Sequence, residues 1–167
     1  MVEWSALLIP IAVSVALVFV ASSVIHMVLQ MHTPDYRKLP DETGAREALG
    51  SVPPGQYIVP HCLDHKEIAK PEVAALFKDG PNAVIWVKPN GQMKLGPFLG
   101  KWILYTAVVS SLVAYLARAT LAPGADYLQV FQVVGASAWM AYAWEAPANS
   151  IWKGMPWSCA FRTLFDG

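Results

Sequence analysis

The run His61-Cys62-Leu63-Asp64-His65 concentrates side chains that ligate metals. Neutral imidazole and thiolate are good ligands for zinc and other transition metals. His61 and His65 are four positions apart, a spacing that places two side chains on one face of a helix. The sequence therefore offers a candidate metal site at His61, Cys62 and His65.

This metal site has a simpler alternative. A closed structural zinc site needs four ligands, and Cys159 or His32 would complete the set only through tertiary folding. Pro60 and a preceding strand-like run also weigh against a helix at this point. The alternative interpretation is a polar loop with a half-buried Cys62.

His26 is the second candidate, because it lies inside a long apolar run. With Ser14, Ser22 and Gln30 it forms a polar stripe at helical spacing. An ionisable residue within a membrane helix is a functional hypothesis by default. His26 could be an axial ligand of haem or a bacteriochlorophyll, or part of a proton path. The alternative is a hydrogen bond between helices or a position at the membrane interface.

Glu145 is a lone carboxylate in an apolar segment, and Lys101 or Lys153 could pair with it. Acid–base catalysis generally needs a positioned partner group. The sequence holds no GxSxG, Walker, Rossmann or CxxC motif. We therefore expect no enzyme activity and no bound cofactor, with metal, haem or pigment binding as the alternative.

Three apolar segments must position these residues. The run from Ala6 to Leu29 carries no charge, and as a helix it would span about 36 Å, against about 30 Å for a bilayer core. Residues 1–31 therefore predict a transmembrane helix. A cleaved signal peptide is the alternative, but no Lys or Arg precedes the run and the run is too long.

Residues 101–151 predict a transmembrane hairpin, with helices at about 101–122 and 126–151. Ala122-Pro123-Gly124-Ala125-Asp126 supplies the turn and an N-cap. The aromatic residues of the tail, 152–167, favour an interfacial anchor.

Composition agrees with a membrane protein. Hydrophobic residues make up 55% of the 167 positions and charged residues only 14%, against about 25% charged in soluble domains. Twelve basic and twelve acidic side chains balance. No basic stripe points to nucleic acid as a partner.

Residues 32–100 form a polar extramembrane subdomain between the first two helices. We expect helices at 41–49 and 71–78 and strands at 56–59 and 83–87, followed by an Asn-Gly turn and a returning strand at 93–95. The fold class is thus an integral membrane protein, mainly α-helical, with three transmembrane helices and a small α+β insertion.

Basic residues set the orientation. Arg37, Lys38, Lys101, Lys153 and Arg162 fall at one end of the predicted helices. The positive-inside rule then places residues 32–100 and the tail in the cytoplasm and the N-terminus in the periplasm. In that orientation Cys62 and Cys159 stay thiols, whereas the inverted one would permit a disulfide.

Small and amide side chains on the predicted helices offer faces for close packing. They could pack the helices against one another or against another membrane protein. The candidate packing residues are Ser22, His26, Gln30, Ser110, Ser111, Ala114, Gln129, Gln132, Gly135 and Ala136.

Several motifs resemble a family of small uncharacterised bacterial inner-membrane proteins. They are the segments 21–29, 35–36, 39–40, 54–62, 89–91 and 113–117. The resemblance implies an inner-membrane protein and no particular activity. Members of that family usually continue past a segment like Leu164-Phe165-Asp166-Gly167 into one more apolar helix, so the resemblance implies either a shorter member of the family or a fourth helix after Gly167.

Three functions of different classes follow from these features. The favoured one is a non-enzymatic accessory subunit that packs against a larger complex, with a photosynthetic or respiratory assembly as a plausible host. Its partners would be the lipid bilayer and other membrane subunits. The second is a metal-, haem- or pigment-binding protein using His26 or His61, Cys62 and His65. The third is a small oligomeric transporter or channel.

Overall fold

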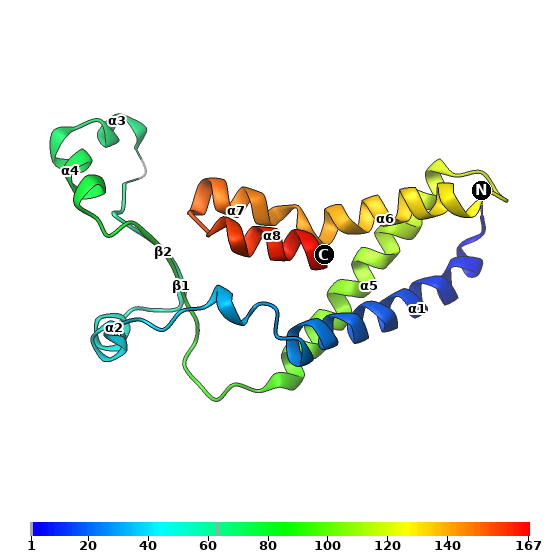
Figure 1. Ribbon diagram of the computed structural model, residues 1–167, viewed down its shortest axis with the longest axis horizontal. Coiled ribbons are helices and arrows are strands. Elements are labelled where there is room, and N and C mark those ends of the chain that lie inside the picture. Colours follow the sequence, from blue (N-terminus) through cyan, green and yellow to red (C-terminus); the bar gives the residue numbers. More distant parts are fainter. Residues whose placement is uncertain (1, 63) are drawn as a thin grey trace.

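Two long apolar helices form the centre of this computed structural model, which describes residues 2–62 and 64–167 (Figure 1). α1 (Trp4–Ser23) continues into a π-helical turn (Val24–Val28), and α5 runs from Leu95 to Thr120. The stretches Trp4–Val28 and Leu95–Thr120 are each long and apolar enough to cross a membrane. Of the predicted membrane helices, these two meet that length and composition.

α1 and α5 lie side by side and antiparallel, with the end of α1 near the start of α5 (Figure 1). At the other end, Arg118 ties the two helices together. Its Nε donates to the backbone oxygen of Val2 at 2.7 Å. Its guanidinium carbon also lies 5.2 Å from the centroid of the Trp4 ring, a cation–π distance.

α6 (Tyr127–Ala143) returns along α5 after a tight turn. The Asp126 carboxylate accepts a hydrogen bond from the backbone N–H of Gln129 at 3.0 Å, so the predicted N-cap is confirmed. α5 buries Thr106, Val109 and Val113, which share one helical face. The helical hairpin predicted from the sequence is therefore present.

The third predicted segment, 126–151, is not one continuous helix. α6 ends at Ala143, and α7 (Glu145–Lys153) begins after Trp144. Pro147 explains the break, because it has no N–H to bond the carbonyl four residues earlier, at Ala143. The uninterrupted helix expected here is wrong at Trp144.

The C-terminal tail, expected only as an interfacial anchor, forms a further helix, α8 (Trp157–Asp166). Gly154, with φ of 69°, ends α7 in the left-handed conformation and lets the chain turn back. α8 then packs on α7 and α6. Cys159 and Ala160 are buried in this contact, and Trp139 of α6 donates its indole N–H to the Leu164 oxygen at 2.8 Å.

An arm, residues 36–94, projects from the end where α1 stops and α5 starts (Figure 1). It contains α2 (Glu42–Leu49), β1 (Gly55–Val59), α3 (His65–Ile68), α4 (Pro71–Asp79) and β2 (Ala83–Val87). The strands are antiparallel, from Gly55 opposite Val87 to Val59 opposite Ala83. The two helices and two strands predicted for this segment up to Val87 are confirmed.

The returning strand predicted at 93–95 is wrong. β2 pairs with β1 instead, and Leu95 already begins α5, earlier than the predicted start at 101. Pro97 is compatible with this early start, because the first turn of a helix leaves its N–H groups without partners inside the helix.

The arm has no core of its own. Among the residues described between 36 and 94, none is buried. The sheet faces the turn between α7 and α8 across an open groove of about 550 Å³. There the Lys153 ammonium lies 5.9 Å from the centroid of the Trp86 ring. The buried residues of the protein belong instead to α5, α6, α7 and α8.

Candidate polar site where α1 ends

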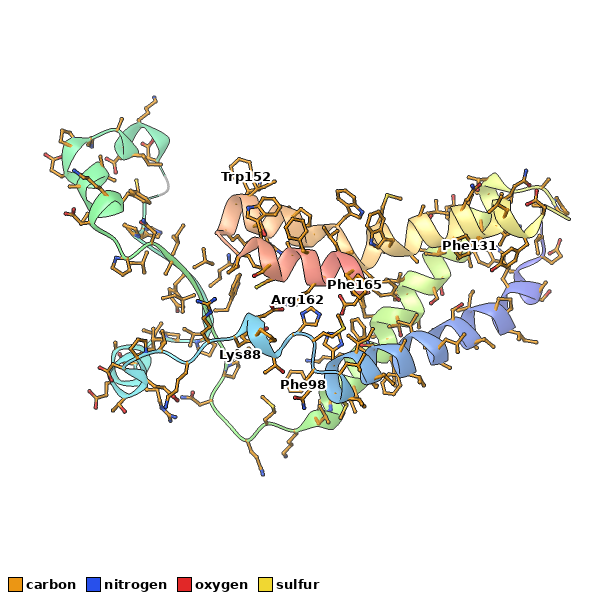
Figure 2. All side chains as sticks on the ribbon, viewed as in Figure 1. Lys88, Phe98, Phe131, Trp152, Arg162 and Phe165 are labelled. Carbon is orange, nitrogen blue, oxygen red and sulfur yellow. The ribbon has the colours of Figure 1, made fainter. Side chains whose placement is uncertain are left out.

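His32 lies just beyond α1 and is held between two carboxylates. Its Nδ1 is 2.7 Å from Asp35 Oδ2, and its Nε2 is 2.9 Å from Asp166 Oδ2. Arg162 binds the other oxygen of Asp35, and Figure 2 shows Arg162 on the side of α8 that faces this segment. The side chains of His32, Asp35 and Asp166 are only 20%, 10% and 8% exposed. We call His32, Asp35, Arg162 and Asp166 the His32 cluster.

Charge and burial act against each other in this cluster. Burial alone would lower the pKa of His32, but its hydrogen bonds and charge interactions with Asp166 and Asp35 outweigh burial and raise it. Burial alone would raise the pKa of Asp35, but contacts with His32, Cys159 and Arg162 outweigh burial and lower it. The environment therefore favours the charged forms of both groups.

α8 supplies half of the cluster from one helical face. Cys159, Arg162 and Asp166 are spaced by three and four residues, so their side chains point in the same direction. Cys159 lies beside Asp35, and burial together with that carboxylate raises the pKa of its thiol. The packing of α8 on α6 fixes this face against the segment that follows α1.

His26 stacks on His32. The two ring centroids are 4.9 Å apart, and the ring planes differ by 7°. His26 Nδ1 lies 2.9 Å from the carbonyl oxygen of Ser22. His26 belongs to the π-helical turn, a local widening that is frequent at functional sites. The predicted candidate His26 therefore lies next to His32, which the sequence analysis considered only as a possible ligand beside Cys62.

His26, His32 and Asp166 offer ligand atoms that suit a metal cation. His26, His32 and Asp166 each offer one ligand atom, and the three atoms lie within 4.8 Å of one another. Cys159, the thiol nearest to the cluster, is buried and has a raised pKa, so it is a poor nucleophile. The cluster therefore favours holding charge or a ligand over nucleophilic chemistry.

The structure only partly describes the predicted site at His61, Cys62 and His65. His61 is exposed, and Cys62 is half-buried, with its thiol 3.5 Å from the Asp64 carbonyl oxygen. His65 begins α3, but its side chain and Leu63 lie outside the described part of the chain. Cys62 and Cys159 are both free thiols, and His32 bonds Asp35 and Asp166 instead of joining His61.

Some of the predicted packing residues are half-buried and the others are exposed. Ser22, Ser110 and Ala114 are half-buried, and so is Gly135, although a Cβ added there would meet no atom within 4 Å. Those that face outward are His26, Gln30, Ser111, Gln129, Gln132 and Ala136. Gln129, Gln132 and Ala136 are therefore exposed on the part of α6 that precedes Trp139, where α8 packs.

Glu145 is exposed at the start of α7 and is absent from the ion pairs of the described residues. The pairing with Lys101 or Lys153 that the sequence allowed is therefore not formed among the described residues, and Lys153 lies over Trp86 instead. Lys101 is likewise exposed.

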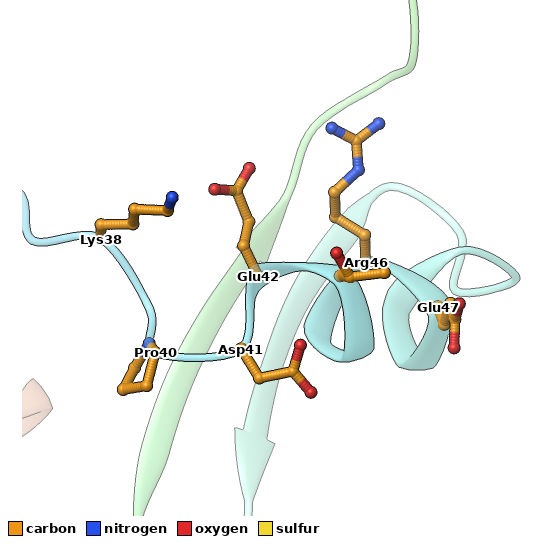
Figure 3. A pocket seen from close by; sticks show the side chains of 7 residues that line it. Lys38, Pro40, Asp41, Glu42, Arg46 and Glu47 are labelled. Carbon is orange, nitrogen blue, oxygen red and sulfur yellow. The ribbon is translucent and has the colours of Figure 1, made fainter.

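A second polar hollow lies on α2 and is open to solvent (Figure 3). Lys38, Glu42 and Arg46 line it together with Asp41 and Glu47. Asp41 is used as the helix N-cap, accepting from the Gly44 N–H at 2.9 Å. None of these residues is among the described residues that form ion pairs. The hollow is an exposed surface of mixed charge without a catalytic arrangement.

Sequence reasoning missed three of the four members of the His32 cluster. The local signals were weak: His32 and Asp35 are three residues apart, and Arg162 and Asp166 are four apart. The helical periodicity of residues 157–166 could have placed Cys159, Arg162 and Asp166 on one face. Nothing local to either segment indicates that the two would meet.

No protein-family model matches the chain, and no curated protein or solved structure matches it either.

Proposed function

We propose that this chain is a non-enzymatic accessory subunit that packs against a larger complex in a bacterial inner membrane. The observation that carries the proposal is the arm, whose described residues are nowhere buried. A segment of this size rarely folds stably without a sizeable core or an external support. An arm without a core is best stabilised by a partner.

Exposed apolar side chains on the arm support the same conclusion. Trp86 and Leu76 are both 57% exposed, and Ile58 is 41% exposed. All three lie outside the two stretches that are apolar enough to cross a membrane. Exposed aromatic and aliphatic groups of this kind favour burial against another protein.

The outward face of α6 supplies a second surface for the proposed partner. Gln129, Gln132 and Ala136 lie on it and are exposed. Small residues and amides are the groups by which membrane helices pack closely and exchange hydrogen bonds. A partner would then contact this chain inside the membrane, through α6, and outside it, through the arm.

The proposed membrane arrangement has three spans. α6, with 17 residues, extends about 26 Å and would be the third span, and α7 and α8 would then lie at the cytoplasmic interface, because the end of α8 contacts His32 just beyond α1. The arm and the end of α8 would face the cytoplasm, and the N-terminus the periplasm. The positive-inside rule supports this, because Arg37, Lys38 and Arg162 lie on the proposed cytoplasmic side. A photosynthetic or respiratory complex is the proposed kind of host.

The test is extraction of the native membrane with a mild detergent, followed by a native gel, mass spectrometry and an absorbance spectrum of the band. The proposal expects the chain in a band far larger than its 18.2 kDa mass, together with defined subunits. Migration of the chain alone would contradict the proposal. Pigment absorbance in the band would point to a photosynthetic host.

Gly135→Leu tests the α6 face specifically. A Cβ added at Gly135 meets no atom within 4 Å, so the chain itself accommodates the start of a larger side chain. We expect the variant to leave the complex by blocking close approach of a partner helix. Gly96→Leu is the matched control, because a Cβ there also meets nothing within 4 Å. Normal association of Gly135→Leu would remove α6 from the proposed interface.

A further inference from the structure

We propose that His26, His32 and Asp166 together bind one divalent transition-metal ion of the zinc class where the chain leaves α1. One ligand atom from each residue lies within 4.8 Å of the other two. Ligand atoms around one tetrahedral zinc ion are about 3.3 Å apart, as zinc–ligand bonds of about 2.0–2.1 Å require. His26 is exposed, so a small rotation of its ring can close the remaining distance.

The hydrogen bonding of His32 is that of a metal ligand. Its Nδ1 bonds Asp35 Oδ2 at 2.7 Å, while its Nε2 faces Asp166 Oδ2 at 2.9 Å. Metal-binding histidines almost always donate the second ring N–H to a carboxylate or a carbonyl, which fixes the tautomer and the ring orientation. Asp35 is itself held by Arg162, so the supporting shell is complete on this side.

His26 shows the same pattern independently. A carbonyl oxygen only accepts hydrogen bonds, so the contact of 2.9 Å between His26 Nδ1 and the Ser22 oxygen makes Nδ1 the donor. Its Nε2 then carries the lone pair that a metal requires. The stacking of His26 on His32, with ring centroids 4.9 Å apart, keeps the two rings close together, and the rotation that brings His26 Nε2 to the ion would tilt its ring out of this stack.

The donor set selects the class of ion. Two imidazoles and one carboxylate are typical of zinc sites with an open fourth position and of other first-row transition metals. Calcium and magnesium prefer oxygen ligands alone. On binding, the proton shared by His32 Nε2 and Asp166 passes to solvent and the cation takes its place.

This site differs from the set suggested by the run around Cys62, and it does not depend on a partner protein. It would join the end of α1 to the last turn of α8. Its failure and the failure of the accessory-subunit proposal are therefore distinguishable, because metal binding is measured on the isolated chain.

The experiment uses the full chain in mild detergent, without a histidine tag and after removal of metal with a chelator. Zn²⁺ is titrated by calorimetry, and bound zinc is counted by elemental analysis after dialysis. We expect one zinc ion per chain. His26→Gln and Asp166→Asn should each weaken binding by more than about 100-fold, because changes in the outer shell alone cost about 10–100-fold.

Asp35→Asn and His61→Gln complete the design. Asp35→Asn alters only the outer shell and should weaken binding by about 10–100-fold. His61→Gln leaves the proposed site intact and should bind zinc like the parent chain. His26 is exposed, so His26→Gln should keep the fold, as circular dichroism would verify.

Three results would overturn the proposal. The first is a parent chain that binds no zinc. The second is undiminished binding in both His26→Gln and Asp166→Asn. The third is loss of binding in His61→Gln alone, which would assign the metal to the run around Cys62.

Discussion

His32 Nε2 and Asp166 Oδ2 lie 2.9 Å apart although 134 positions separate the residues in the sequence. The contact joins the segment that leaves the first apolar helix to the last turn of the last helix. It brings polar groups together beside an apolar helical unit, where an unpaired charge would be costly. α8 is thereby attached at its C-terminal end as well as through its contact with α6.

Arg162→Ala should destabilise the protein through the carboxylate that it leaves behind. Asp35 is only 10% exposed, and without Arg162 one of its oxygens loses its cationic partner. We expect the free energy of unfolding to fall by about 1–2 kcal/mol, as for removal of one partner of a largely buried polar contact. Thermal unfolding of the purified chain in detergent measures this.

Lys70→Ala is the matched control for Arg162→Ala. Lys70 and Glu67 form an ion pair at 2.7 Å, but their side chains are 56% and 50% exposed. Exposed pairs contribute at most about 1 kcal/mol and often nothing measurable. Equal losses in the two variants would contradict the role assigned to burial in the His32 cluster.

Ala160→Leu should separate α8 from α7 and α6. Ala160 is fully buried, with 0% exposure, so added methylene groups must displace the packed helices. Overpacking of this kind costs about 1–3 kcal/mol. Phe161→Leu, at a neighbouring position that is 63% exposed, should change stability by no more than about 0.5 kcal/mol. Thermal unfolding distinguishes the two variants.

The two cysteines should react with thiol reagents at different rates. Burial and Asp35 raise the pKa of the Cys159 thiol, and thiolate is the reactive form. Cys62 is half-buried in the arm. We expect slow alkylation of Cys159 near neutral pH, faster alkylation as the pH rises, and fast alkylation once the protein is denatured. Mass spectrometry of labelled peptides reports each site separately.

The same reagents test the orientation. In sealed membrane vesicles, an impermeant reagent should label Cys62 from the cytoplasmic side. Labelling of Cys62 from the periplasmic side would reverse the proposed topology. Fast labelling of Cys159 in the folded protein would contradict the burial of α8.

The arm should be the first part of the isolated chain that trypsin cuts. Segments 36–41 and 88–94 have no regular structure and contain the trypsin sites Arg37, Lys38 and Lys94. Local opening is easiest where few contacts are buried. We expect these sites to be cut well before Arg118 and Arg162, and to be protected when the chain is in its complex. Early cleavage at Arg162 would show that α8 opens first.

Local features of the fold were predictable because single residues determine them. Asp126 caps its helix as expected, Asp41 caps α2 in the same way, and Gly80, with φ of 68°, ends α4. Such signals depend on the backbone within a few residues. The break at Trp144 was also readable in principle from Pro147, but the apolar composition on both sides of it suggested one continuous helix.

The His32 cluster was not predictable, because it depends on where α8 comes to lie. Arg162 and Asp166 are ordinary charges at the end of an amphipathic stretch until α8 folds back over α6. His26 was identified from its apolar surroundings alone. Its neighbour His32 was considered only as a further ligand that tertiary folding would bring to Cys62, whereas the structure pairs it with Asp35 and Asp166.

α1 is held at both of its ends, by the contacts of Arg118 with Val2 and Trp4 at its start and by the His32 cluster after its last turn. It can neither slide along its axis nor rotate about it without breaking contacts near one membrane face or the other. We therefore expect any displacement of the arm to be absorbed by segments 36–41 and 88–94, which have no regular structure. In this arrangement α1 and α5 would be the fixed base relative to which the arm changes direction.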